Sequence, residues 1–150
     1  MKKAICILPD HGHIIFSQSC KKHVMVEFDL HGFVPNSTHA IHIHEFGDLS
    51  DGCTSLGPHY NPDNVTHGSI FIPENPRHAG DLINNLVTDK KGRFRYAYTD
   101  DKLAVHDIVG RSVVIHKGVD DLGVGGDAES LKTGNAGDRI SCGIIGWKRV

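Results

Sequence analysis

Val24-Met25-Val26-Glu27-Phe28-Asp29-Leu30 is the stretch that decides the fold, because apolar and polar side chains alternate along it. A period of two is typical of a strand with one buried face and one solvated face. The same alternation recurs over residues 93–99, where Phe94, Tyr96 and Tyr98 are the apolar members.

Further candidate strands surround these two, and helical periodicity is weak throughout. They lie at residues 3–8, 14–18, 40–44, 82–88, 112–117 and 140–147. Turn signals such as Pro9-Asp10-His11-Gly12 and Asp89-Lys90-Lys91-Gly92 separate them. Eight short strands with such turns predict an all-β, antiparallel sandwich or barrel.

Two long segments interrupt this rhythm. Residues 45–80 are rich in Gly, Pro, Asn and His, and residues 118–138 are rich in Gly and charged side chains. Loops beyond about 15 residues are uncommon in compact domains and are usually functional or disordered. Both segments are therefore predicted to be functional loops.

Length and charge restrict the class of protein. The 150 residues fit one domain, expected to span 1–150, and the net charge of −2 argues against nucleic acid or an anionic membrane as the main partner. No apolar run approaches the roughly 20 residues of a membrane-spanning helix. The apolar start is short and ends at Pro9, so no signal peptide is expected and a cytoplasmic location is predicted.

Histidine is the residue type that indicates chemistry, with 12 in the chain. His42 and His44 are two apart in a candidate strand, so their imidazoles point the same way. The segment from His59 through His67 to His78 and Asp81 supplies three imidazoles and a carboxylate, a set that tetrahedral zinc accepts.

His42, His44 and His116 would form a second, nitrogen-only site on strands. One more imidazole would give the four nitrogens that suit copper(II), and the economical solution is that His59 bridges both metals. A His-x-His pair alone is equally compatible with a structural role. His39 lies on the opposite strand face and is expected to be a packed core histidine.

Several motifs resemble copper–zinc superoxide dismutase, in chain order from residue 3 to 147. They are His42-Ile43-His44-Glu45-Phe46-Gly47-Asp48, Gly57-Pro58-His59-Tyr60-Asn61-Pro62, Arg77-His78-Ala79-Gly80-Asp81-Leu82, Lys132-Thr133-Gly134-Asn135-Ala136-Gly137 and Gly143-Ile144-Ile145-Gly146. The resemblance implies a Greek-key β-sandwich or barrel of eight strands and an antioxidant enzyme that dismutates superoxide to dioxygen and hydrogen peroxide, by cycling between Cu(II) and Cu(I).

The resemblance also implies ligands and roles for single residues. Copper would be held by His42, His44, His59 and His116, and zinc by His59, His67, His78 and Asp81. Asp120 would link the two ligand sets, and His59 would also donate a proton. Arg139 would guide the anion beside copper, with Lys132, Thr133 and Glu129 at the channel. Ala128 stands where the family often has a second acidic residue, and Asp138 adjoins the guiding arginine.

The four cysteines are spaced too widely for a zinc ribbon or a C-x-x-C motif, which leaves room for one disulfide and two free thiols. The resemblance implies a disulfide between Cys53 and Cys142, closing a loop of about 90 residues and worth about 4 kcal/mol. Cys6 is expected to be buried and inert, and Cys20 exposed.

The segment between His67 and His78 looks longer and more apolar than is typical of the family, and a further insertion is expected near residues 83–86. Residues 70–72 are expected to pack on the barrel or at a contact surface.

Family members are mostly homodimers, so a homodimer is expected, with Leu49 and Trp147 at the contact, and a copper chaperone is a possible partner. Two alternatives compete: a non-enzymatic relative, either a copper-chaperone-type domain or a decoy, and a purely structural zinc domain. The first usually lacks a copper ligand, the guiding arginine or a disulfide cysteine, whereas this chain has them all. The second leaves His42, His44, His116 and Arg139 unexplained.

Overall fold

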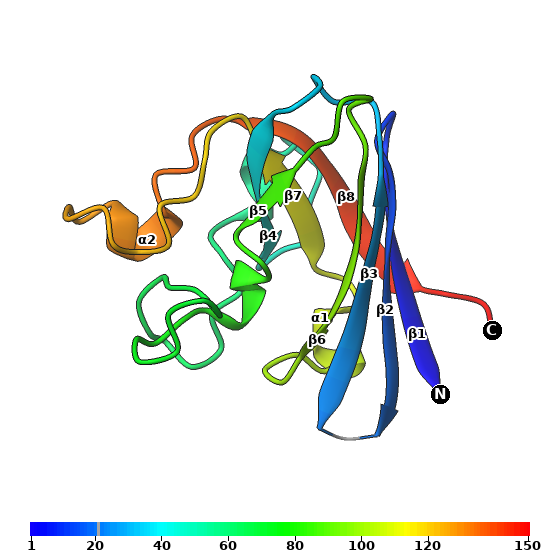
Figure 1. The fold of residues 1–150 in the computed structure, drawn as a ribbon. Coiled ribbons are helices and arrows are strands. Elements are labelled where there is room, and N and C mark those ends of the chain that lie inside the picture. Colours follow the sequence, from blue (N-terminus) through cyan, green and yellow to red (C-terminus); the bar gives the residue numbers. More distant parts are fainter. Residues whose placement is uncertain (21) are drawn as a thin grey trace.

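Eight strands form a nearly closed antiparallel barrel in the computed structural model, which describes residues 1–20 and 22–150 (Figure 1). The strands are β1 (Lys2–Leu8), β2 (Gly12–Cys20), β3 (His23–Leu30), β4 (Thr38–His44), β5 (Asn85–Val87), β6 (Phe94–Asp100), β7 (Ser112–His116) and β8 (Arg139–Trp147). The predicted fold class is confirmed.

The strand order is β5-β4-β7-β8-β1-β2-β3-β6, and every pairing is antiparallel. The chain crosses from β3 to β4 and from β6 to β7, so that β4, β7 and β8 become neighbours; these crossings give the Greek-key topology. They also bring together β4 and β7, which carry candidate ligands, and β8, which begins at Arg139.

Alternation along the strands builds the core. In β3, Val24, Val26 and Leu30 are fully buried while Met25 and Glu27 are exposed, as the period of two predicts. Because successive side chains point to opposite faces, each strand contributes one row to a single apolar cluster inside the barrel.

The predicted strand at residues 82–88 is wrong over its first half. Only Asn85–Val87 form β5, preceded by the 3₁₀ turn η2 (Ala79–Asp81). Leu82 and Asn84 have φ of 49° and 63°, a left-handed conformation that no strand accommodates. Both side chains are nevertheless buried, which is why the segment has the composition of a strand.

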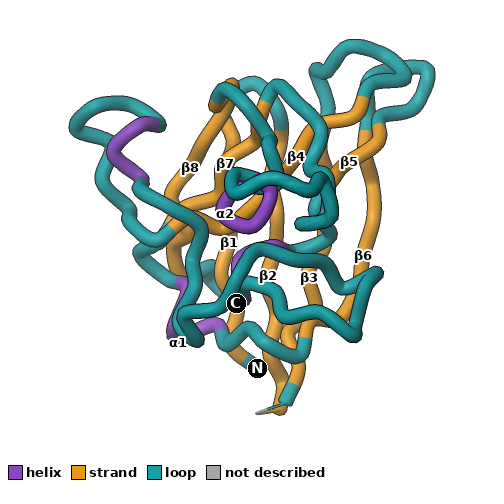
Figure 2. Tube along the Cα trace, turned by 90° about the vertical axis from the view of Figure 1, so that its left-hand side faces the viewer, coloured by secondary structure: helices purple, strands orange, loops and turns teal. Residues whose placement is uncertain are grey.

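Helical structure is confined to short turns in the long connections: η1 (Thr54–Leu56), α1 (Val105–Ile108) and α2 (Ser130–Thr133). Within the described residues, none of these helices has the length and apolar character needed to cross a membrane. Figure 2 shows the long loops gathered on one side of the strands, with α2 carried by the second loop. The loops and the face of β4 and β7 that is turned away from the apolar core together frame the site.

Candidate metal centre

β4 and β7 supply three of the predicted ligands. His42 and His44 lie two residues apart in β4 and are 0% and 1% exposed, and His116 ends the neighbouring β7. His42 and His44 share a strand face, as expected, because both offer a nitrogen to the same group whereas Ile41 and Ile43 belong to the apolar core.

His59 reaches the same place from the first long loop. It forms an isolated antiparallel bridge with His44, and the next residue, Tyr60, donates its amide to the Ile43 carbonyl at 2.8 Å. The Tyr60 carbonyl accepts the Gly80 amide at 2.9 Å. The backbone therefore pins the loop across β4 and brings η2, with Asp81, beside His59.

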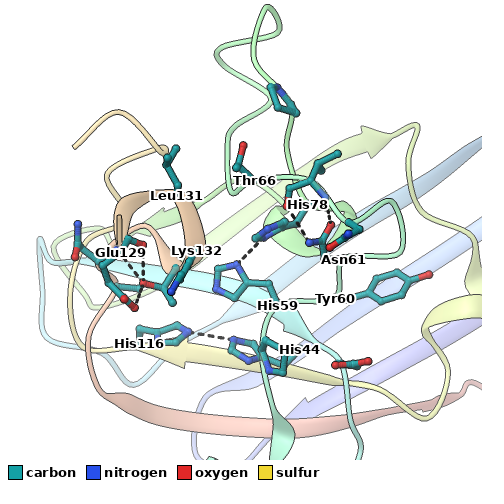
Figure 3. Close-up of a pocket in the computed structure, with 18 of the residues that line it drawn as sticks. His44, His59, Tyr60, Asn61, Thr66, His78, His116, Glu129, Leu131 and Lys132 are labelled. Atoms are coloured by element: carbon teal, nitrogen blue, oxygen red, sulfur yellow. Dashed lines mark hydrogen bonds between the residues drawn. The ribbon is translucent and has the colours of Figure 1, made fainter. Parts of the chain in front are cut away.

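Four imidazoles form the first ligand group: one ring nitrogen each of His42, His44, His59 and His116, all within 4.8 Å of one another. His42 Nδ1 and His59 Nε2 are buried with no hydrogen-bond partner among the described residues, and His44 Nε2 faces His116 Nε2 at 3.3 Å. Figure 3 shows the His44 and His116 rings pointing toward one another below His59. Buried, unpartnered nitrogens in a nitrogen-only cluster fit copper.

The other nitrogen of each strand histidine is fixed by an acceptor. His42 Nε2 donates to Asp120 Oδ2 at 2.6 Å, His44 Nδ1 to the Gly57 carbonyl at 2.7 Å, and His116 Nδ1 to the Gly137 carbonyl at 3.0 Å. Such partners set the tautomer and ring orientation of a metal-binding histidine. Each ring is thus left with one nitrogen directed at the cluster.

The second group centres on one carboxylate oxygen. Asp81 Oδ1 lies 3.1 Å from His59 Nδ1, 2.9 Å from His67 Nδ1 and 3.1 Å from His78 Nδ1. Asp81 Oδ2 is already held by the amides of Gly68 and His78. Three nitrogens around one oxygen are the donor set of a tetrahedral zinc site.

One ligand atom each of His42, His59, His67 and Asp81 also lies within 4.8 Å of the others, a grouping that contains His42 in place of His78. The hydrogen bonds favour His78 as the member of the second group. His42 Nε2 is already bonded to Asp120, and its remaining nitrogen, Nδ1, belongs to the first group. His78 Nδ1, in contrast, lies 3.1 Å from His59 Nδ1 (Figure 3).

Asp120 links the two groups, as expected from the sequence. Its second oxygen, Oδ1, accepts from His67 Nε2 at 2.8 Å, and the residue is 2% exposed. The Asn84 side-chain amide donates to Asp120 Oδ2 at 3.1 Å and to the Gly68 carbonyl at 2.8 Å. Sequence reasoning missed Asn84; its left-handed φ, which Asn tolerates better than most residues, is the only local signal.

Burial and neighbouring charges divide these groups by protonation state. Burial lowers the pKa of His42 to about 3 and that of His116 to about 4, and it lowers the pKa of His44 well below its usual range. These imidazoles are therefore neutral at pH 7, the form that binds metal. Burial alone would lower the pKa of His67, but its bonds to Asp120 and Asp81 raise it to about 9.

Both carboxylates are held ionised. Burial alone would raise the pKa of Asp81, but the hydrogen bonds from His59, His67 and His78 hold it well below its usual range. Burial acts in the same sense on Asp120, and the bonds from His42 and His67 likewise hold its pKa well below the usual range. The centre therefore offers two carboxylates and, at His42, His44 and His116, neutral imidazoles, which fits divalent cations; His67 would lose its proton when a metal binds.

Arg139 lies at the floor of an open pocket that also contains His44, His59 and His116. Its guanidinium donates to the Cys53 carbonyl at 2.8 Å and the Gly57 carbonyl at 2.7 Å, and it forms no ion pair with a described residue. Because Gly57 also accepts from His44, one carbonyl orients both side chains. The result is a fixed, uncompensated positive charge beside the first ligand group.

The predicted channel residues line the same pocket. Lys132, Thr133 and Glu129 belong to α2 and its N-cap, and the Thr133 hydroxyl donates to the Glu129 carboxylate at 3.0 Å. Figure 3 places Lys132 above His116 and Thr66 across from Leu131.

The disulfide between Cys53 and Cys142 is confirmed. It joins the first long loop to β8 over a sequence separation of 89 residues. Of the two free thiols, Cys20 is exposed and Cys6 is buried, and burial raises the pKa of Cys6 to about 12. Cys6 is thus a neutral thiol at physiological pH, as predicted.

The expectation for His39 is wrong, whereas that for residues 70–72, to pack on the barrel or at a contact surface, is met on the barrel at Ile70. His39 is half-buried rather than a core residue, because its Nδ1 bonds to the His116 carbonyl and its Nε2 to the Ser37 hydroxyl. In the apolar insertion, Ile70 packs against the barrel core but Phe71 is 61% exposed.

Comparisons with known proteins agree with this geometry. Residues 10–145 match the copper/zinc superoxide dismutase family. A superoxide dismutase (Cu-Zn) of Paramecium bursaria Chlorella virus 1 is 44% identical over 97% of this chain and 79% of its own length. Superoxide dismutase (Cu-Zn) A of Xenopus laevis is 44% identical over 98% of this chain and 99% of its own.

A crystal structure of the clock protein EA4 superposes with a TM-score of 0.86, at 40% identity, over 96% of this chain and 93% of that one. Fold, donor sets and sequence similarity therefore point the same way, and the non-enzymatic alternative is not favoured. The chain belongs to the copper–zinc superoxide dismutase family, whose members bind copper and zinc and convert superoxide to dioxygen and hydrogen peroxide.

Proposed function

We propose that residues 1–150 act as a single domain in which His42, His44, His59 and His116 hold copper, while His59, His67, His78 and Asp81 hold zinc. The observation that carries this assignment is the pair of buried nitrogens, His42 Nδ1 and His59 Nε2, that face the first group without a partner. His59 is the one residue with a nitrogen in each group, since its Nδ1 meets Asp81.

When bound, copper supplies the electron transfer, oxidising one superoxide to dioxygen and reducing a second to hydrogen peroxide, and zinc supplies only charge and order. The side chains of the site supply a proton and fix the geometry. His59 holds a proton at Nε2 and supplies it as one of the two protons that peroxide formation consumes. Asp120 is ionised and accepts hydrogen bonds from His42 and His67, so it fixes the orientation of both imidazole rings.

Arg139 positions the substrate. A guanidinium fixed by two main-chain carbonyls loses little entropy when an anion binds, and its remaining positive charge attracts superoxide to the pocket floor. Lys132 adds a second, mobile cation at the mouth, while Thr133 narrows the channel. The Glu129 carboxylate is engaged by the Thr133 hydroxyl and so holds that side chain in place.

The test is elemental analysis of the purified protein together with superoxide decay by pulse radiolysis. We expect about one copper and one zinc per chain. A His44→Ala variant should retain zinc and lose most of its copper and at least about 100-fold in rate, because one of four donors is gone. His23→Ala, at an exposed histidine of β3, is the control. Full activity in His44→Ala would refute the copper assignment.

We further propose a homodimer. Leu49 and Trp147 are 49% and 54% exposed, and residues 47–50, 109–110 and 143–147 form the surface expected from the family resemblance. Exposed apolar side chains of this size are costly unless covered. Sedimentation of the metal-loaded protein should give twice the chain mass, and Trp147, the chain's single tryptophan, should shift its emission to the blue on association. A monomer at micromolar concentration would contradict this.

A cytoplasmic location and delivery of copper by a copper chaperone complete the proposal; both follow from the family resemblance. Expression in cells with and without their copper chaperone, followed by copper analysis of the purified protein, tests the second. Equal copper content in the two preparations would contradict chaperone dependence, and fractionation of the native host tests the location.

A further inference from the structure

Arg111 lines the pocket of the metal centre, although it belongs to neither ligand group. Its side chain is partly buried, and the described part of the chain offers it no ion-pair partner. The guanidinium donates to two main-chain carbonyls instead, from Nε to Asp107 at 2.7 Å and from Nη1 to Glu45 at 2.9 Å. The chain segments that these contacts join therefore indicate its role.

The contact with Glu45 fixes the residue that directly follows His44. β4 ends at His44, which is paired with Ser112 of β7, so the next pair of a continued ladder would be Glu45 and Arg111. The Arg111 amide cannot serve this ladder, because it donates to the Ile108 carbonyl at 3.0 Å. The guanidinium takes its place and holds the Glu45 carbonyl.

The guanidinium also lies over the ring of Tyr60, with its Cζ 4.2 Å from the ring centre. Tyr60 directly follows His59, and its amide donates to the Ile43 carbonyl at 2.8 Å. Figure 3 shows the Tyr60 ring directed away from His44 and His59. A cation over an aromatic face is attracted to it, so Arg111 holds the segment of His59 from outside the ligand group.

The segments that carry His44 and His59 also pair with each other. Glu45 donates its amide to the carbonyl of the residue before His59 at 2.9 Å, beside the bridge between the two histidines. These main-chain contacts set the register of the two segments, but neither of them reaches β7. Arg111 supplies that link, and the strand that it precedes ends at His116, a third member of the first group.

The shape of the arginine side chain suits this task. Its donors lie in one rigid plane, so the carbonyls of Asp107 and Glu45 are held at a fixed separation while the face of the plane rests on Tyr60. Asp107 belongs to α1, which gives the link an anchor outside the loop. A lysine carries the same charge on one nitrogen and cannot make these three contacts together.

We infer that Arg111 is a positioning residue for the copper site, which holds the segments of His44 and His59 at a fixed place against the start of β7. It touches neither substrate nor metal. The inference rests on the proposed assignment of copper to the first ligand group. Without Arg111 all four donors are still present, so copper binds, but two imidazoles are free to shift around it.

Arg111→Met tests this role, because methionine keeps much of the aliphatic chain and removes the guanidinium. In the metal-loaded variant the hyperfine splitting of the Cu(II) EPR spectrum should change. Copper affinity, measured by competition with a chelator, should fall about tenfold. The dismutation rate should fall about fivefold, while the zinc content remains that of the wild type.

Arg111→Lys separates position from charge. It keeps the positive charge in the pocket but loses the planar pair of donors. The EPR spectrum should change as in Arg111→Met, and copper affinity should again fall about tenfold. Recovery of the wild-type spectrum and rate in the lysine variant would show that Arg111 acts by its charge, and would overturn the inference.

Two matched controls complete the series. Arg95→Met removes the same charge from a side chain that is 72% exposed and paired only with Asp29, so spectrum, affinity and rate should all stay at the wild-type values. Tyr60→Phe keeps the aromatic face beneath the guanidinium and should keep the wild-type spectrum. Tyr60→Leu removes that face and should shift the spectrum in the direction of Arg111→Met.

All spectra are recorded at urea concentrations where circular dichroism shows a fully folded chain, because a purely structural role would lower stability and leave the copper spectrum unchanged. A folded Arg111→Met protein with the wild-type spectrum and copper affinity would overturn the inference. If that variant does not fold, an unchanged spectrum in Tyr60→Leu has the same consequence. Wild-type protein whose EPR spectrum shows no copper bound by nitrogen would instead refute the proposed function.

Discussion

Gly134 shows how one residue without a side chain serves the metal centre. It follows α2 with a left-handed φ of 69°, and a Cβ there would lie 2.5 Å from both Asp120 Oδ1 and His67 Nε2. These are the two atoms whose hydrogen bond ties the second ligand group to the first. The position therefore requires glycine for space as well as for backbone conformation.

We expect Gly134→Ala to weaken zinc binding about tenfold, because the methyl group displaces Asp120 from His67. Competition with a chromophoric chelator measures this affinity. Gly126→Ala is the matched control: its φ is also positive, at 87°, but a Cβ there meets nothing within 4 Å. If both variants bind zinc as tightly as the wild type, the Asp120–His67 bond does not set zinc affinity.

The residues of the site were largely predictable because metal ligands must be of a few types. His42, His44, His59 and His116 are brought together, and so are His67, His78 and Asp81, with Asp120 between the groups. Asn84 was not predictable, because it acts through a bond to Asp120, 36 positions away, and has no spacing signature. The contributions of the Gly57 and Gly137 carbonyls were not predictable either, because side-chain patterns do not show where main-chain oxygens lie.

At the scale of elements, a buried ion pair fastens the zinc-side loop to β6. Arg77 donates to Asp100 at 3.1 Å and to the His78 carbonyl at 3.3 Å, while the Tyr98 hydroxyl donates to Asp100 at 2.9 Å. The partners come from β6, at the opposite end of the strand order from β5. One polar cluster thus connects the edge of the barrel to the backbone of His78.

Asp100→Asn should lower the free energy of unfolding by about 3 kcal/mol, since it leaves a buried guanidinium with only the exposed Asp101 carboxylate, 3.4 Å away. Tyr98→Phe should lower it by about 1 kcal/mol, the usual cost of one hydrogen bond. Asp101→Asn is the control, because that carboxylate is 74% exposed and should matter by less than about 0.5 kcal/mol. Denaturant titration measures all three; equal effects would contradict the role of burial.

The metal-free protein should lose stability as pH falls from 7 to 5. Burial lowers the pKa of His42 to about 3 and of His116 to about 4, so both stay neutral in the folded chain but take up protons on unfolding below pH 6.5. Each contributes a loss of about 2 kcal/mol over this range. His67 acts oppositely: its pKa of about 9 gives stability that is present below 6.5 and lost toward pH 9.

Urea unfolding of the metal-free chain across this pH range tests the prediction. We expect a maximum near pH 6.5 to 7 and a falling midpoint on the acid side. A midpoint that is flat from pH 7 to 5 would contradict the burial of neutral imidazoles. The metal-loaded protein is the comparison, and its midpoint should be higher throughout because bound metal stabilises only the folded state.

Elements were predictable where a local pattern decides them. β3 and β6 follow from alternation that one buried face imposes. The prediction failed at residues 82–84 because Leu82 and Ile83 are buried in the core, as strand residues would be, whereas the φ angles of Leu82 and Asn84 belong to a turn that the composition does not reveal. The length of this strand was also predicted incorrectly, since β5 contains only three of the seven expected residues.

For the molecule as a whole, the Greek-key crossings and the disulfide cooperate. β4, β7 and β8 meet only because the chain crosses the barrel twice, and Cys53–Cys142 then fixes the first loop to β8. Because Arg139 is held by the Cys53 carbonyl, the disulfide also fixes the guanidinium. Neither strand order nor this carbonyl contact follows from periodicity; the order was expected only from the family resemblance.

Replacing both Cys53 and Cys142 by serine should therefore lower stability by about 4 kcal/mol, the loop-entropy estimate, and also lower the dismutation rate. The loss of rate should persist under conditions where the variant is fully folded, as judged by circular dichroism. Cys20→Ser, at an exposed free thiol, is the control. A folded double variant with the wild-type rate would show that Arg139 needs no such tether.

In the proposed centre one imidazole, that of His59, binds two different metals. Anomalous diffraction from crystals of the loaded protein, recorded at the copper and the zinc absorption edges, tests it most directly. We predict two peaks roughly 6 Å apart, copper at His59 Nε2 and zinc at His59 Nδ1, since metal–nitrogen bonds are about 2 Å long. A single peak, the same metal in both positions, or an ion beyond bonding distance of His59 would show that His59 does not bridge copper and zinc.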